Sequence, residues 1–402
     1  MRPFPARASR GPRRPRAACA ATLMGACLVA GTIAPGIASS QVSPDPARPV
    51  PAVPAVQGAG STGLAWSGFV DTYVAWDAGR PADLGRGYTT TAARHAEFNV
   101  NLAYLGATWT SERVRGRLAL QGGTSVQANY APEPRVGAPS GPDLARLLQE
   151  AYAGVRLRDG LWVDAGIHFA PFGREGWISA DNWTYTRSLI ADHSPYYQSG
   201  VRLSWVATPT VSAQLHVLNG WQNISETNDD KAIAASLDWT FARGHVLSWD
   251  AFAGNEQPDS VPRRLRLFHE LSWQGTLTDR FEAMATFDLG RQARSTAAGR
   301  TATWWGTALV ARHAVSPGRA WVALRGEAYH DPDRVIIRPA GGGAFLARGA
   351  SVNVDVAPQS GVLWRTELRA LRGRDAVFAD RDAAGGLGRG NLVVVSSLAW
   401  RF

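Results

Sequence analysis

The sequence predicts an all-β fold: a transmembrane, antiparallel, up-and-down β-barrel of about 16 strands. Three observations carry this prediction. The N-terminal segment has the layout of an export signal, and the final strand ends on an aromatic residue, Phe402. Between them, apolar and polar residues alternate with a period of two from Leu64 onward. That region contains no run of the roughly 18 apolar residues that a membrane helix needs.

Residues 1–40 are interpreted as a cleaved export signal peptide. Residues 2–16 are basic and rich in proline, and residues 17–34 are apolar and mostly small. Small residues follow near 38–40, where cleavage is expected. The layout indicates export from the cytoplasm, and with a barrel it places the mature protein in the outer membrane of a Gram-negative cell.

The next segment, residues 41–62, is rich in proline and alanine and predicts an extended linker. The barrel is therefore expected to occupy residues 63–402. The net charge of +9 overstates the basic character of that region, because six arginines and no acids lie in the signal segment. Without them, 36 basic residues face 33 acidic ones, since 42 minus 6 is 36. This balance gives no reason to expect a nucleic-acid partner.

The strands are read from the alternation of apolar and polar residues. In residues 211–217, Val211, Ala213, Leu215 and Val217 face one way and the intervening polar residues face the other. Segments of this kind number about 16. They lie at 64–76, 94–110, 113–128, 146–158, 161–171, 197–207, 210–221, 231–242, 245–254, 263–275, 279–290, 300–313, 319–330, 345–356, 359–372 and 390–402.

Charged residues in the middle of the strands decide which kind of β-protein this is. A soluble sandwich, whose polar face meets solvent, usually needs about seven to nine strands, whereas about 16 run here without a domain linker. A water-filled lumen tolerates charges at mid-strand in a barrel of that size. The resulting candidates for the pore lining are Arg113, Arg115, Arg117, Asp164, Arg202, Asp250, Arg266, Arg325, Glu327, Arg365, Glu367 and Arg369. Inward arginines and inward acids nearly cancel, so two interpretations stay open: a local row that favours anions, or ion pairs that brace the wall.

Two further features fit a barrel of the outer membrane. Connections alternate between short turns and long loops, as they do when turns face the periplasm and loops face outward. The final strand, residues 391–402, alternates and ends on Phe402. It is similar to the closing strands that the barrel-assembly machinery recognises, so this machinery is an expected partner, together with outer-membrane lipid.

One part of the chain resembles a known family. Residues 177–231, together with 122–130 and 148–152, are similar to the OmpL-like β-barrel porins of the outer membrane. The resemblance covers roughly residues 65–290 well and the last third only as strands of the right kind. It implies a passive aqueous channel for small hydrophilic solutes or ions, with no cofactor and no catalytic residues. By analogy with other barrels of this size, it also implies a homotrimer.

The long connection at 172–196 is unusually aromatic. We expect it either to fold into the lumen as a constriction or to remain an external loop whose rings lie at the membrane interface. The candidate constriction residues are Trp177, Asp181, Trp183, Tyr185, Arg187, Asp192 and Tyr196.

Two alternatives to a channel remain. One is a non-conducting barrel that anchors, adheres or stiffens the envelope. The other is an outer-membrane hydrolase, because His193 and Ser194 adjoin Asp192, although the G-x-S-x-G motif is absent and adjacent side chains rarely form a triad. Acidic clusters such as residues 226–230 lack the spacing of known metal motifs, so no metal is expected.

Overall fold

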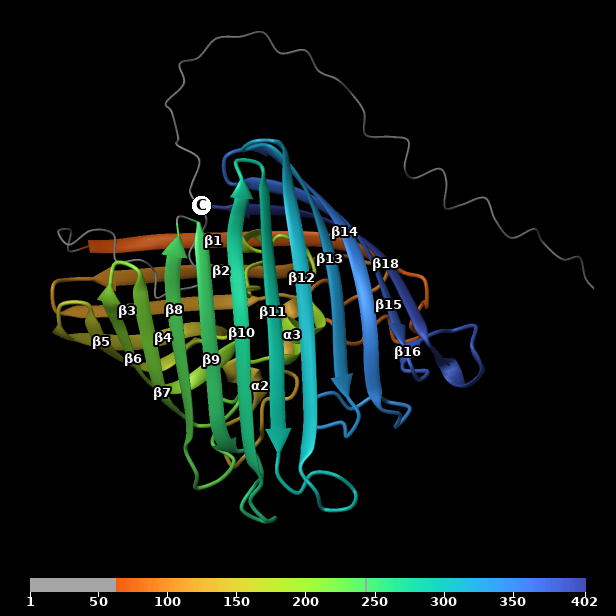
Figure 1. Ribbon diagram of the computed structural model, residues 1–402, viewed down its shortest axis with the longest axis horizontal. Helices are drawn as coiled ribbons and strands as arrows, with labels where there is room; N and C mark the ends of the chain where they lie inside the picture. The colour runs from red at the N-terminus through yellow and green to blue at the C-terminus, as the bar shows by residue number, and fades with distance from the viewer. Residues whose placement is uncertain (1–62, 243) are drawn as a thin grey trace, which may run out of the picture. The chain divides into compact units, whose positions relative to one another are not determined.

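A computed structural model describes residues 63–242 and 244–402, and in this part of the chain 16 antiparallel strands close into one barrel. Figure 1 shows the strands following one another around the wall in chain order. The last barrel strand pairs with the first, Val70 lying opposite Trp400, which closes the ring. Closure leaves no strand edge unpaired, which a sheet in lipid requires. The expected signal peptide and linker lie outside the described residues.

The predicted strand number and order are confirmed, and most strand ends agree within three residues. The barrel strands are β1 (Gly63–Asp77), β2 (Phe98–Thr110), β3 (Val114–Gly122), β4 (Leu148–Arg158), β5 (Leu161–Phe169), β6 (Tyr197–Thr208), β7 (Val211–Leu218), β8 (Ala232–Ala242), β9 (His245–Asn255), β10 (Leu265–Thr278), β11 (Phe281–Gln292), β12 (Ala302–Ser316), β13 (Ala320–Asp331), β14 (Phe345–Gln359), β15 (Val362–Gly373) and β18 (Gly390–Arg401).

The largest error in the strand prediction is at the end of the third strand. Strand β3 stops at Gly122, and helix α1 (Thr124–Tyr130) follows it. Gly123 between them has φ 132°, and a Cβ there would lie 2.4 Å from a backbone oxygen, so the chain turns where only glycine fits. Val126 and Tyr130 are buried four residues apart, a helical spacing that the alternating pattern had concealed.

The connections alternate in length as predicted. Seven short turns, such as residues 159–160 and 360–361, lie at one end of the barrel, and eight long loops lie at the other. The loops also contain short elements: helices α2 (Pro142–Ala145) and α3 (Leu189–His193), 3₁₀ turns at Ser179–Asp181 and Ala384–Gly386, and a hairpin of β16 (Phe378–Ala379) and β17 (Leu387–Gly388).

The outer face of the wall is apolar and carries aromatic rings near the short turns. Trp66, Trp109, Trp239, Trp364 and Trp400 are all about half exposed and point away from the lumen. Trp at this level fits the boundary between hydrocarbon and water. No helix among the described residues is long and apolar enough to cross a membrane. The outer face therefore has the surface that a strand-built wall needs in lipid.

The inner face is polar and packed. Its buried side chains include many carboxylates, guanidiniums and hydroxyls, such as Asp71, Asp164 and Arg365. Apolar clusters interrupt this polar lining, and the two largest surround Tyr130 with Tyr197 and Trp304. Both contain residues of loops that lie within the barrel, so the core of this protein is built between its wall and its own inserted segments.

Candidate functional site

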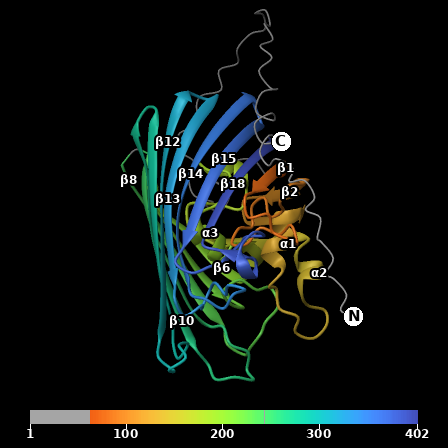
Figure 2. The same ribbon diagram turned by 90° about the vertical axis from the view of Figure 1, so that its right-hand side faces the viewer.

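The connection between β5 and β6, residues 170–196, lies inside the barrel, and we call it the inserted loop. Tyr185 and Leu189 are fully buried in it. Its helix α3 contacts β12 and β13, and the views in Figures 1 and 2 both place α3 within the ring of strands. On β12, a Cβ at Gly306 would lie 2.2 Å from the side chain of Ile190, so glycine allows the loop to approach the wall closely.

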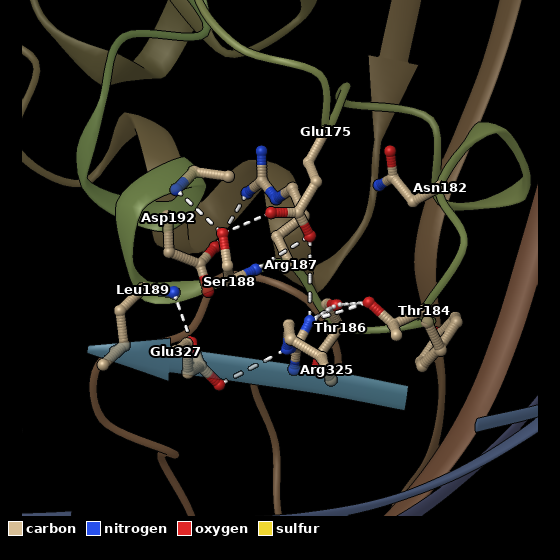
Figure 3. Close-up of polar contacts among 12 residues, drawn as sticks. Glu175, Asn182, Thr184, Thr186, Arg187, Ser188, Leu189, Asp192, Arg325 and Glu327 are labelled. Atoms are coloured by element: carbon tan, nitrogen blue, oxygen red, sulfur yellow. Dashed lines mark hydrogen bonds and ion pairs between the residues drawn. The ribbon is translucent and has the colours of Figure 1, made fainter. Parts of the chain in front are cut away.

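One set of wall contacts centres on Arg325 of β13. Its guanidinium donates to the hydroxyls of Thr184 at 2.7 Å and Thr186 at 2.9 Å, and to the carboxylate of Glu367 at 2.9 Å. Glu367 of β15 in turn accepts from the backbone N–H of Thr186 at 2.6 Å. Figure 3 shows Arg325 directed at the part of the loop that carries Thr184 and Thr186. A single buried arginine thus joins the loop to two strands.

A second set holds the start of α3. Glu327 of β13 accepts from the backbone N–H of Leu189 at 2.7 Å, and Arg369 of β15 donates to the same carboxylate at 2.9 and 2.8 Å. Within the loop, Glu175 accepts from the backbone N–H of Ser188 at 3.0 Å (Figure 3). These charge-assisted bonds satisfy backbone groups that would otherwise be buried without partners.

A third set of contacts holds residues 179–182 of the loop against β1 and β15. Arg365 of β15 is held by Asp355 of β14 at 2.8 and 2.9 Å and donates to the carbonyl of Asn182 at 2.8 Å. Asp71 of β1 accepts from the hydroxyl of Ser179 at 2.7 Å. At the other end of the loop, Arg174 donates to Ser272 of β10 at 3.2 Å and pairs with Asp238 of β8 at 3.5 Å, so the loop is bonded to strands on both sides of the lumen.

The residues predicted for a constriction all belong to the inserted loop, and all but the half-buried Asp181 are buried. The guanidinium of Arg187 stacks 3.4 Å from the ring of Tyr196 and pairs with Asp192 at 3.0 Å. Asp181 pairs with Arg401 of β18. The rings of the loop lie inside the barrel and not on its lipid face. The remaining members are Trp177, Trp183 and Tyr185.

The wall away from the inserted loop is braced by ion pairs. Asp164 of β5 accepts from Arg115 of β3 at 2.7 and 2.6 Å and from Arg202 of β6 at 3.0 Å. Arg117 of β3 pairs with Glu150 of β4 at 2.5 Å. In these positions the arginines bind neighbouring carboxylates, which is the bracing arrangement and not an open row of cations.

Three inward carboxylates form a row across neighbouring strands. Asp250 of β9 lies opposite Glu270 of β10, which lies opposite Asp288 of β11. Each has one buried oxygen without a hydrogen-bond partner, and among the described residues none forms an ion pair within 4.0 Å. Arg174 of the inserted loop approaches the row but donates to Ser272 at 3.2 Å and to Ser248, and it pairs with Asp238 of β8 at 3.5 Å. The row is therefore a group of carboxyl side chains that is almost completely shielded from solvent.

Eleven of the 12 residues predicted to line the pore lie on inward positions of strands. The exception is Arg113, which is exposed in the short turn before β3, because the strand begins one residue later than predicted. Arg266 of β10 binds Gln292 at 2.9 Å. Asp355 was missed although strand alternation places it inward with Asn353. Thr184, Thr186 and Ser188 were missed because a loop has no periodicity to reveal them.

The side chains considered for hydrolysis and metal binding have other partners. Asp192 accepts from Arg187, at 3.0 Å, and from Thr90, at 2.8 Å, and not from His193. Glu226 pairs with Lys231 in an external loop. Within residues 63–242 and 244–402, no group of three His, Cys, Asp or Glu side chains is arranged to hold a metal ion.

Protonation of the buried His193 is expected to destabilise the folded protein at low pH. Burial lowers the pKa of His193 from 6.5 to about 4. The unfolded state therefore binds more protons than the folded state between these values, and stability falls as the pH drops from about 6.5 toward 4. We expect the urea midpoint to fall over this interval in the native chain and to fall less in His193→Phe. The phenylalanine keeps the edge contacts with Tyr329 and Phe345. Equal falls in both proteins would contradict this prediction.

The family model described as "Putative beta-barrel porin-2, OmpL-like" matches residues 63–402, which is the whole barrel. No curated protein matches this sequence significantly.

Solved structures with the same fold are similar to this chain over most of its length. The anion-selective porin from Comamonas acidovorans is 12% identical, with a TM-score of 0.54, and the match covers 85% of this chain and 100% of that one. The channel DcaP of Acinetobacter baumannii is 12% identical, with a TM-score of 0.56 and coverages of 84% and 97%. OprB of Pseudomonas putida is 11% identical, with a TM-score of 0.55 and coverages of 85% and 94%. At these identities the likeness shows the fold alone.

Proposed function

Since the chain belongs to the OmpL-like β-barrel porin-2 family and forms a passive channel in the outer membrane, we propose that the inserted loop sets the width of that channel. One observation carries the proposal: residues 170–196 are hydrogen-bonded to the inner wall through Arg325, Glu327 and Arg365. A 16-strand barrel is wide enough for an aqueous lumen. A loop held inside the lumen narrows it to a size suited to small hydrophilic solutes or ions.

The test is planar-bilayer conductance of the refolded barrel. We expect discrete steps of fixed size and a current that rises linearly with voltage, as in a passive pore. A correctly folded barrel without conductance would show that the inserted loop seals the lumen. That result would favour the alternative function, a non-conducting barrel that anchors or adheres.

The inward charges of the wall predict weak ion selectivity. Most inward arginines bind carboxylates, and the side chains of Asp250, Glu270 and Asp288 are almost completely buried, so they are not in contact with passing ions. We therefore expect the cation-to-anion permeability ratio to lie close to one, and Asp250→Asn to change it little. The measurement is the reversal potential in a salt gradient. A strong preference for cations or for anions in the native chain would contradict the prediction.

The proposal extends to the partners of the barrel. The strand that closes it ends at Phe402, whose ring lies against Gly68 and is 4.7 Å from Trp400. This aromatic end is proposed as the signal for the barrel-assembly machinery. Outer-membrane lipid covers the apolar face, and assembly into a homotrimer remains a proposal, as does cleavage of the signal peptide near residues 38–40. The family and fold indicate a channel and not an enzyme.

A further inference from the structure

Two arginines face outward from the barrel wall and lie directly opposite each other. Arg348 of β14 pairs in register with Arg372 of β15. Both are exposed, while their neighbours Ala347 and Leu371 are buried and face inward. No hydrogen bond or ion pair among the described residues involves either guanidinium. Like charges placed opposite each other on a sheet destabilise it. An anion bound between the two guanidiniums would offset this repulsion.

The two arginines line a depression of about 400 Å³ on the outer surface of β12 to β15. His330 lies beside them, stacked on Trp305 with ring centroids 5.4 Å apart. Arg389 also lines the depression. Arg374 also lines the depression, and it pairs with the adjacent acid Asp375 at 3.1 Å. The depression therefore has a surplus of cationic donors and a flat aromatic wall.

The level of this depression on the barrel matches the headgroups of the outer leaflet. It lies at the ends of the strands that join the long loops, which face the outside in barrels of this kind. Two residues nearer the middle of the wall, Ala350 lies opposite Ala370. The next lipid-facing pair in that direction is Val352 and Leu368, and both side chains are nearly half exposed. The arginines thus lie at the boundary between the apolar band and water.

A second, apolar depression lies nearer the middle of the wall and reaches β13 at Gly326. It has a volume of about 370 Å³ and is lined by Gly326, Leu309 and Trp273 among others. Gly326 lies two residues from Ala328, which lines the basic depression. A Cβ at Gly326 would meet nothing within 4 Å, so there is open space for a larger side chain at this position. A cationic depression next to an apolar one is complementary to a phosphate group that is joined to an acyl chain.

We propose that this surface binds a phosphorylated, acylated headgroup of the outer leaflet. Arg348 and Arg372 bind a phosphate, and an acyl chain lies along β13 over Gly326. Guanidiniums bind phosphate oxygens in pairs and remain charged at any physiological pH. The inference goes beyond the channel function and requires only that the barrel stands in the outer membrane with its long loops outside. The loss of conductance would not affect it.

The test is native mass spectrometry of the detergent-purified barrel titrated with diphosphorylated lipid A. We expect Arg348→Gln combined with Arg372→Gln to weaken binding about tenfold, because charge-assisted bonds to phosphate are lost. The matched control removes two charges at the other end of the barrel, Arg280→Gln combined with Arg319→Gln, and leaves binding unchanged. Both of those arginines are exposed in short turns.

Further arms separate the lipid from other occupants. Gly326→Leu fills the apolar depression and is expected to weaken lipid A binding without changing the folded barrel. Equal binding of lipid A by the native chain and the Arg348/Arg372 variant would overturn the proposal. So would a variant that keeps its lipid affinity but changes its oligomeric state in lipid-free detergent, which would assign the arginines to a contact between copies. If inorganic phosphate at the lipid concentration displaced lipid A completely, the acyl chain would have no role.

Discussion

Removing residues 178–192 of the inserted loop is expected to raise single-channel conductance by about twofold or more, because the segment no longer occupies the lumen of a 16-strand barrel. The deleted segment contains the buried Tyr185 and the whole first turn of α3. It also carries the backbone groups that bind Glu327 and Glu367. The measurement is single-channel conductance in a planar bilayer, with a short glycine-serine bridge across the gap.

The matched control shortens an external loop that has no role in the lumen. Residues 296–299 connect β11 and β12 and are mostly exposed, so their removal should leave conductance unchanged. If the 178–192 deletion gave a folded barrel with the conductance of the native chain, the inserted loop would not be the constriction. A similar increase in both deletions would point to a general loosening of the barrel.

Replacing Arg325 by methionine is expected to release the inserted loop from the wall. The substitution leaves Glu367 and Glu327 with fewer cationic partners in a buried site, and the loss of one member of such a network typically costs about 3–5 kcal/mol. Arg325 also binds Thr184 and Thr186, so the penalty falls on the seating of the loop. We expect a higher, noisier conductance and a lower urea midpoint.

Arg117→Met is the control for this experiment. Arg117 pairs with Glu150 on the wall and donates to Thr108 at 2.9 Å, and within the described residues none of its hydrogen bonds or ion pairs involves the inserted loop. The control should lower the urea midpoint while the conductance stays steady. Arg325→Met with native conductance and native noise would show that the loop is held by its apolar contacts and not by this arginine.

The side of the wall on which most side chains lie was predictable, because every second residue of a strand points to the same face. Asp164, Arg202 and Glu367 were placed inward by alternation alone, and all three are buried there. The same rule failed at Thr124–Tyr130, where a short helix happens to preserve an apolar alternation. It also failed at Arg113, since parity says nothing about where a strand begins.

The inserted loop was predictable as a segment of interest, but its arrangement in the barrel was not. Aromatic composition drew attention to residues 172–196, but two positions, inside the lumen or at the membrane interface, remained open. The residues that decide between them are Thr186, Ser188 and Leu189, whose backbone N–H groups find carboxylates on the wall or in the loop. A backbone group carries no sequence signal, so only the folded barrel reveals these bonds.

The sequence by itself determined the local and periodic properties of this protein: the strands, the face on which each side chain lies, the alternation of turns and loops, and the kind of charge that the wall presents. These follow from a period of two and from the choice of residues at turns. Which charges neutralise one another, where the inserted loop is fastened, and which arginines are left facing lipid depend on register and closure. Those are contacts between residues far apart in the chain, such as Arg325 with Thr184 or Arg348 with Arg372, and only the tertiary structure brings them together.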